Sequence, residues 1–255
     1  MKMPSRYHRD FLLTLVQKEL SLRYRYTWLG FLWAVINPVL QMLSLGMVFK
    51  LFTRVDIDHY FLFLFIGLIP WNFFSQSLHQ VTPIIIAKRH LLTKSNFPKE
   101  FLPLSLILVN LLHFFVAMVI ALPLVTVNYE LSWSKLLFVP LSLLWLVGLT
   151  GGLSLLTSAA TVYFRDINFV VKNFLPLWFY MTPILYTQDI TPALLQPLLY
   201  LNPMAGVIEL MRFGLSITST ISLDLVGSNL LISCLICILG WYVFQKSKPY
   251  FVDKL

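Results

Sequence analysis

Long apolar runs alternate with short polar segments along most of the chain. Six of these runs are near the roughly 20 residues that an α-helix needs to cross a bilayer. They cover residues 29–52, 60–80, 101–127, 136–161, 167–186 and 225–245. We expect each run to be helical, because a backbone in contact with lipid must satisfy its own hydrogen bonds. The pattern predicts an all-α, polytopic membrane protein with six transmembrane helices.

The segment before the first run has a different pattern. Apolar residues recur at helical spacing between Phe11 and Leu20, while polar residues such as Asp10, Gln17 and Lys18 take the other face. This periodicity predicts an amphipathic helix that lies in the membrane surface, within a cytoplasmic segment of residues 1–28. Such a helix is either a plain anchor or a docking surface for a partner, and the pattern alone does not separate the two.

Two connections between the runs are unusual. The link of residues 81–100 places apolar Ile84–Ala87 directly before Lys88, Arg89 and His90, which predicts a short helix at the membrane surface. The stretch 187–222 is too apolar for a solvated loop, and Pro192, among other prolines, divides it into pieces too short to cross. Short helices that enter the membrane and turn back fit this stretch, so we expect an external re-entrant hairpin there.

Composition and charge support a bilayer setting and orient the chain within it. Of the 255 residues, 58% are hydrophobic and only 12% are charged, whereas a soluble domain carries about 25% charged residues. Most of the nineteen Lys and Arg residues fall in the N-terminal segment, the 81–100 link, the segment around Arg165 and the C-terminus. Because basic loops stay on the cytoplasmic side, we expect a multi-pass membrane protein with both termini cytoplasmic.

Several motifs that carry chemistry do not occur in the sequence. There is no G-x-x-x-x-G-K-[ST] loop for nucleotide phosphates, no H-E-x-x-H zinc motif and no G-x-S-x-G nucleophile turn. We therefore expect no catalytic set and no metal or cofactor bound by this chain. If ATP drives the protein, another subunit must bind it.

Amides and aromatic side chains inside the apolar runs are the candidate functional groups. Polar groups are costly within a membrane, so each is either part of a path for a polar substrate or a hydrogen-bonding partner between helices. Aromatic rings that face a channel would stack on sugar rings, and the others belong to interface belts or helix packing. The channel candidates are Trp33, Asn37, Gln41, Trp71, Asn72, Gln76, Trp178 and Tyr180.

The stretch 187–222 also carries two charges. Glu209 and Arg212 are three residues apart, so on a helix they could form an ion pair. Whether such a pair only fastens the hairpin or also gates an exit is left open by the sequence.

An ordered set of short motifs resembles the polysaccharide-export permeases of the ABC-2 type. The set begins with Arg23–Gly30, Leu32–Trp33 and Asn37–Pro38 at the first apolar run. It continues with Phe164–Ile167 and Thr182–Tyr186 around the fifth run, and with Leu201–Met204 before Glu209 and Arg212. Each motif alone is weak, but together they cover almost the whole chain in order.

The resemblance implies a homodimer that works with a dimer of cytoplasmic ABC ATPase subunits, which bind ATP and magnesium. It also assigns roles to segments of this chain. The ATPase-coupling residues would be Ile84, Ile85, Lys88, Arg89, His90 and Lys94. The gate through which substrate enters would contain Arg23, Arg25, Tyr26 and Trp28. The external gate would contain Glu209 and Arg212.

The resemblance further implies a function. The expected activity is export of a lipid-linked, O-antigen-like polysaccharide from the cytoplasmic to the outer side of the inner membrane. The alternatives within the same family are teichoic acid, capsule or small lipophilic compounds. An alternative of another class is a membrane-embedded glycan-processing enzyme, which would need catalytic carboxylates or histidines clustered at one depth.

Overall fold

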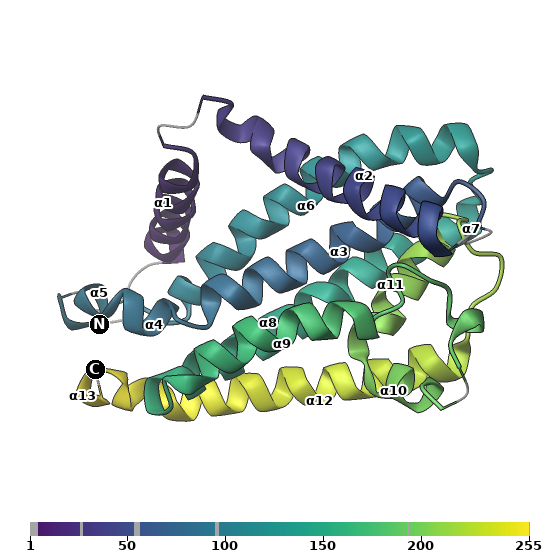
Figure 1. Ribbon diagram of the computed structural model, residues 1–255. Helices are drawn as coiled ribbons and strands as arrows, with labels where there is room; N and C mark the ends of the chain where they lie inside the picture. Colours follow the sequence, from purple (N-terminus) through teal and green to yellow (C-terminus); the bar gives the residue numbers. More distant parts are fainter. Residues whose placement is uncertain (1–4, 26–27, 54–56, 95–96, 193, 255) are drawn as a thin grey trace.

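The computed structural model describes residues 5–25, 28–53, 57–94, 97–192 and 194–254, and this part of the chain contains helices and connections without any strand. Figure 1 shows the arrangement of the helices. The long helices are α2 (Trp33–Thr53), α3 (Tyr60–Val81), α6 (Phe101–Asn128), α8 (Phe138–Tyr163) and α12 (Leu223–Ser247). The others are α1 (Ser5–Tyr24), α4 (Ile84–Ala87), α5 (Arg89–Lys94), α7 (Trp133–Leu136), α9 (Asp166–Met181), α10 (Gln196–Leu201), α11 (Pro203–Gly214) and α13 (Phe251–Lys254), with single 3-10 turns at Gly30–Leu32, Gln188–Ile190 and Lys248–Tyr250.

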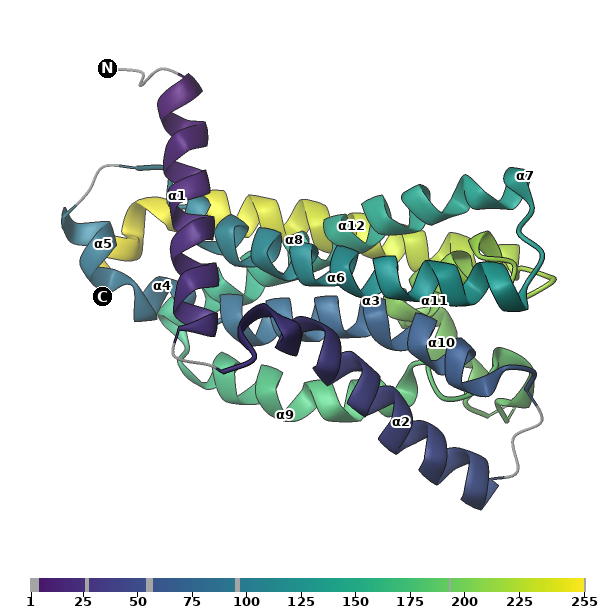
Figure 2. The same cartoon turned by 90° about the horizontal axis from the view of Figure 1, so that it is seen from above.

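The helices form one bundle with two distinct ends. Helices α4, α5 and α13 gather at one end, and α7, α10 and α11 gather at the other (Figure 1); we call these the α5 end and the α11 end. Helix α1 lies across the bundle axis at the α5 end (Figure 2). That orientation suits a helix that lies in a membrane surface rather than one that crosses it.

Five stretches of the described chain are long and apolar enough to cross a membrane, and they contain α2, α3, α6, α8 and α12. The fifth predicted run, 167–186, is shorter than expected. Its helix α9 has 16 residues and ends at Met181, which gives it a length of about 24 Å, whereas the hydrocarbon core is about 30 Å thick. The helix stops there because Pro183 disfavours helical backbone at Thr182, which is extended.

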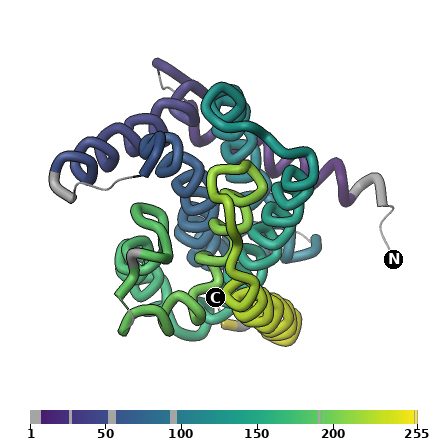
Figure 3. Tube along the Cα trace, turned by 90° about the vertical axis from the view of Figure 1, so that its right-hand side faces the viewer, coloured from purple at the N-terminus to yellow at the C-terminus, as the bar shows by residue number. Residues whose placement is uncertain are grey.

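Helix α3 is the centre of the bundle. It packs against α2, α6, α8, α9 and α11, and most of its residues are buried. Viewed along the bundle, α2 lies on the opposite side from α12 (Figure 3). Exposed apolar side chains such as Leu40, Met47 and Leu51 cover α2, which suits a surface facing lipid or another membrane protein.

Glycines allow a close contact between the backbones of α8 and α12. A methyl group added at Gly240 would lie 1.9 Å from the carbonyl oxygen of Gly152, and one added at Gly152 would lie 2.4 Å from the Cα atom of Cys237. Small residues of this kind let two membrane helices approach until their backbones touch.

Candidate functional site

The first candidate site is a cavity of about 350 Å³ enclosed by α1, α2, α3 and α6. Its polar lining residues are Arg23, Tyr24, Asn37, Asn72, Gln76, Asn110 and His113. Such a density of amides and ring nitrogens between membrane helices is costly unless the groups bind one another, water or a polar ligand.

Arg23 and Tyr24 dock α1 onto the middle of α6. The Arg23 guanidinium donates to Asn110 Oδ1 at 3.1 Å, and its Nη1 atom lies 2.7 Å from His113 Nδ1. A guanidinium can only donate, so Nδ1 accepts. In the neutral ring Nε2–H then donates to the hydroxyl oxygen of Tyr24, which is 2.7 Å away. Asn110 and His113 were not among the channel candidates, and no feature of the sequence indicated that they contact α1.

The other residues predicted to admit substrate lie near this junction. Arg25 is exposed and has further contacts in the structure. Trp28 is 97% exposed, so its indole is available to lipid or to a partner. Tyr26 lies outside the described residues. The structure thus brings Arg23 into the first cavity but not Trp28.

The second candidate site is an open groove of about 610 Å³ between α2, α3 and α9. Its lining residues are Gln41, Ser44, Leu45, Trp71, Ser75, Gln76, His79, Lys172, Leu175, Pro176, Phe179 and Tyr180. Asn72 of the first cavity donates to Gln41 of the groove at 2.9 Å, and Gln76 lines both sites.

The eight channel candidates therefore differ in the site that they line. Trp33, Asn37 and Asn72 line the first cavity. Gln41, Trp71 and Tyr180 line the groove, and Gln76 lines both. Trp178 lines neither of these two sites.

Trp178 and Trp71 have packing roles in this arrangement. Trp178 donates its indole N–H to Asn202 at 2.8 Å, and Asn202 in turn caps α11 by accepting from Met204 N. Trp71 is buried against Phe74 and Phe179, so it forms the floor of the groove rather than an exposed stacking platform.

The predicted ATPase-coupling segment folds as two short helices, α4 and α5. Ile84 and Ile85 are buried and hold α4 against α6 and α8, so any part they take in coupling is to position the segment. Lys88 forms an ion pair with Glu19 of α1 at 2.7 Å. Arg89 and His90 are exposed at the surface. Lys94 ends α5, and its side chain lies outside the described part.

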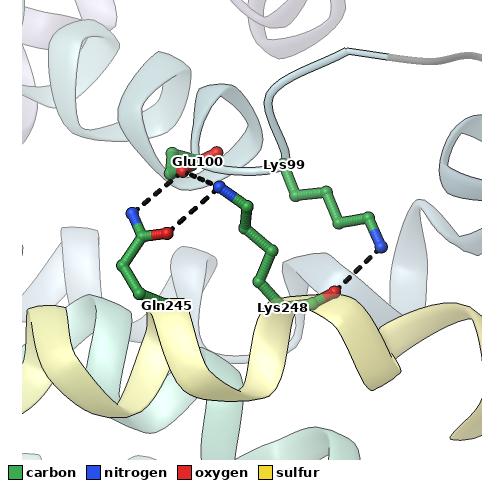
Figure 4. Close-up of polar contacts among 4 residues, drawn as sticks. All are labelled: Lys99, Glu100, Gln245 and Lys248. Carbon is green, nitrogen blue, oxygen red and sulfur yellow. Dashed lines mark hydrogen bonds and ion pairs between the residues drawn. The ribbon is translucent and has the colours of Figure 1, made fainter.

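A cluster of polar side chains joins the segment between α5 and α6 to the end of α12 (Figure 4). Glu100 accepts from Lys248 at 2.5 Å and from Gln245 at 3.0 Å, and Lys99 donates to the carbonyl oxygen of Lys248 at 2.9 Å. Burial alone would raise the pKa of Glu100, but the hydrogen bonds from Lys248 and Gln245 hold it below its ordinary value. The sequence analysis did not identify this cluster. A usable signal was present, because Glu100 directly precedes the run 101–127 and Lys248 follows the run 225–245 on the same predicted side of the membrane.

The predicted pair of Glu209 and Arg212 does not form. Arg212 is buried, with 3% of its surface exposed, and donates to the carbonyl oxygens of Pro183 at 2.6 Å, Ile184 at 2.8 Å and Phe63 at 3.2 Å. Its guanidinium also lies 3.5 Å from the centre of the Phe63 ring. Glu209 instead accepts from Ser222 N at 2.7 Å and from Gln188 at 3.2 Å.

These two charges fasten different parts of the α11 end. Arg212 ties α11 to α3 and to the segment after α9, while Glu209 ties α11 to the 3-10 turn Gln188–Ile190 and to Ser222 before α12. Arg212 does not pair with Glu209 because its guanidinium binds the carbonyl groups of Pro183 and Ile184, which follow the end of α9. A guanidinium has several N–H donors and can bind several acceptors at once.

The fold and these sites define an integral membrane protein with polar clefts between its helices. The sequence profile of the family described as ABC-2 type transporter matches residues 11–215. The match extends from α1 to the end of α11 and covers well over half of the chain, so the protein belongs to the ABC-2 type transporter family, as its motifs predicted.

Two relatives are similar over most of their length. The chain is 39% identical to the O-antigen export system permease protein RfbA of Myxococcus xanthus over 209 residues, 78% of each protein. It is 32% identical to the O-antigen export system permease protein RfbA of Klebsiella pneumoniae over 256 residues, which is 100% of this chain and 98% of that protein.

Proposed function

We propose that this chain is the membrane-spanning permease subunit of an ATP-driven exporter of lipid-linked, O-antigen-like polysaccharide. The observation that carries the proposal is the end-to-end similarity to an O-antigen export permease. The two polar clefts support it, because a glycan needs amides, hydroxyl groups and aromatic faces along its path through the membrane.

The orientation follows from charge. Lys88, Arg89, Lys99 and Lys248 belong to the α5 end, so by the positive-inside rule that end is cytoplasmic, together with both termini, in the bacterial inner membrane. The α11 end then faces outward, and the hairpin formed by α10 and α11 shapes the external exit.

Coupling to ATP takes place at the α5 end in this proposal. A cytoplasmic ABC ATPase dimer binds ATP and Mg²⁺, contacts the surface around Arg89 and His90, and pushes on α4 and α5. The ion pair from Lys88 to Glu19 carries that movement to α1. The Glu100–Lys248 contact carries it to α12. A symmetric pair of permease subunits would close the open groove between α2 and α9 into a channel.

The alternatives differ in cargo more than in architecture. Teichoic acid, capsule or small lipophilic compounds would use the same helices, and full-length similarity to an O-antigen permease favours the O-antigen-like cargo over them.

The test is ATP hydrolysis and export by the purified chain in lipid vesicles, with and without the ATPase subunit encoded beside it. We expect hydrolysis only in the complex, with stimulation by polyprenyl-linked glycan. A chain that forms no complex with any ATPase would contradict the proposal, and stimulation by a small lipophilic compound instead of the glycan would select the alternative cargo.

A further inference from the structure

The groove between α2, α3 and α9 contains a lysine beside a histidine. Lys172 of α9 and His79 of α3 both line it, together with hydroxyl and amide groups from Gln41, Ser75 and Gln76. None of the residues that line the groove is Asp or Glu. The groove therefore offers hydrogen-bond donors and positive charge to a ligand without a competing carboxylate.

Lys172 is a cation with no anionic partner in the part of the chain that the structure describes. The ion pairs found there join Arg9 to Asp10, Lys88 to Glu19 and Lys248 to Glu100. Lys172 is the seventh residue of α9, about 9 Å along the helix from its first residue. An unpaired ammonium within a membrane helix is costly and is expected to face water or an anionic ligand.

Lys172 and His79 are separated from Tyr180 and Trp71 by the same number of residues along their helices. Trp71 precedes His79 by eight residues on α3, and Tyr180 follows Lys172 by eight residues on α9, which is about 12 Å along each helix. α3 runs toward the α5 end and α9 runs away from it (Figure 1). Lys172 and His79 therefore lie together nearer the α5 end, and Trp71 and Tyr180 lie nearer the α11 end.

We propose that Lys172 and His79 form a binding subsite for the diphosphate group of a polyprenyl-linked glycan, with Tyr180 placed to stack on its first sugars. The identity of this ligand rests on the proposed function. A diphosphate is the anion best suited to the site, because it accepts charge-assisted hydrogen bonds from several donors at once. The separation of Lys172 and Tyr180 along α9 then places the linked sugars against the exposed ring of Tyr180.

The first cavity, which Arg23 lines, is a weaker candidate for binding the same anion. Arg23 already donates to Asn110 and contacts His113, so its charge is partly satisfied by the protein. The phosphate group of an ordinary phospholipid is the other source of the same chemistry, and the experiment must separate it from a polyprenyl diphosphate.

The test uses the complex of this chain with its ATPase partner in phosphatidylcholine vesicles. The probe is a radiolabelled polyprenyl diphosphate with a photoreactive group, and the readout is covalent labelling of the permease subunit. We expect Lys172→Gln with His79→Gln to reduce labelling roughly tenfold, as removal of charge-assisted contacts would. Lys172→Arg keeps the charge and should retain most of the labelling.

The control variant is Lys246→Gln, which removes an exposed lysine in the last turn of α12 and should leave labelling unchanged. Co-purification with the ATPase shows that each variant is folded. Equal labelling of the double variant and the wild type would overturn the subsite, as would competition by phosphatidylglycerol equal to that by unlabelled polyprenyl diphosphate. Loss of export by the wild type with labelling intact would contradict the proposed function and not the subsite.

Discussion

Arg212 is the buried charge on which the α11 end of the bundle depends. Its guanidinium serves three carbonyl groups, of Pro183, Ile184 and Phe63. We predict that Arg212→Lys destabilises the protein by about 1.5–3 kcal/mol, because an ammonium cannot reproduce the fork and leaves a buried carbonyl without a hydrogen bond. Thermal unfolding of the purified subunit in detergent measures the loss. Arg165→Lys, at an exposed position before α9, is the matched control, and equal melting of both variants would contradict this role.

Glu100 makes stability depend on pH at the other end. Its pKa is lowered in the folded protein because Lys248 and Gln245 bind the carboxylate, against the opposing effect of burial. The contact therefore adds stability above the ordinary glutamate pKa of 4.5 and loses it as the pH falls through the lower folded value. We predict that wild type melts at a higher temperature than Glu100→Gln at neutral pH, and that the difference vanishes in acid. A difference that is independent of pH would show that the charge has no part in the contact.

Single residues were the part of the molecule least accessible from sequence. The three-residue spacing of Glu209 and Arg212 permitted an ion pair, but it gave no information on competing acceptors. Those acceptors exist because α9 stops before Pro183 and leaves free carbonyl groups beside α11. Likewise, Asn72 and Gln76 were channel candidates because they are amides within an apolar run, whereas the cavity and groove that they line depend on which helices pack against α3.

At the scale of helices, the α8–α12 contact depends on glycine. A side chain at position 240 would meet the backbone of Gly152. We predict that Gly240→Ala costs about 1–3 kcal/mol, because the two helices must move apart to accept the methyl group. Gly148→Ala is a control on α8 with open space around the new methyl group and should be nearly neutral. Thermal unfolding of both variants in detergent checks the prediction, and a neutral effect at position 240 would show that the helices separate easily.

The helices themselves were well predicted, because the bilayer imposes a strong length requirement on apolar runs. The predicted run 101–127 corresponds to α6 and the run 225–245 to α12, each within a few residues. The exception is the run 167–186, where hydropathy continued through Pro183 but the helix did not. Hydropathy reports burial of side chains and not the backbone restriction that proline imposes on the residue before it.

For the whole molecule, the proposed mechanism has the α5 end transmit movement to the helices around the groove. The connections there join elements far apart in sequence: Lys88 of the coupling segment binds Glu19 of α1, and Glu100 before α6 binds Lys248 after α12. Such contacts are set by the tertiary arrangement, so the sequence indicated a coupling segment but not the helices to which it is tied.

Exchange of the charges at Lys88 and Glu19 distinguishes two possible roles of Lys88 in the proposed coupling segment: holding α1, or binding the ATPase directly. If Lys88 acts by holding α1, then Lys88→Glu and Glu19→Lys each place like charges together and weaken the contact by about 1–3 kcal/mol. Each single variant should lose most ATP-driven export while keeping ATP hydrolysis in the complex, and the double variant should recover both contact and export. If Lys88 instead binds the ATPase directly, the double variant will remain inactive, because the reversed charge still faces the partner. Export into vesicles, measured beside hydrolysis for all three variants, decides between a contact inside the permease and one across to the ATPase.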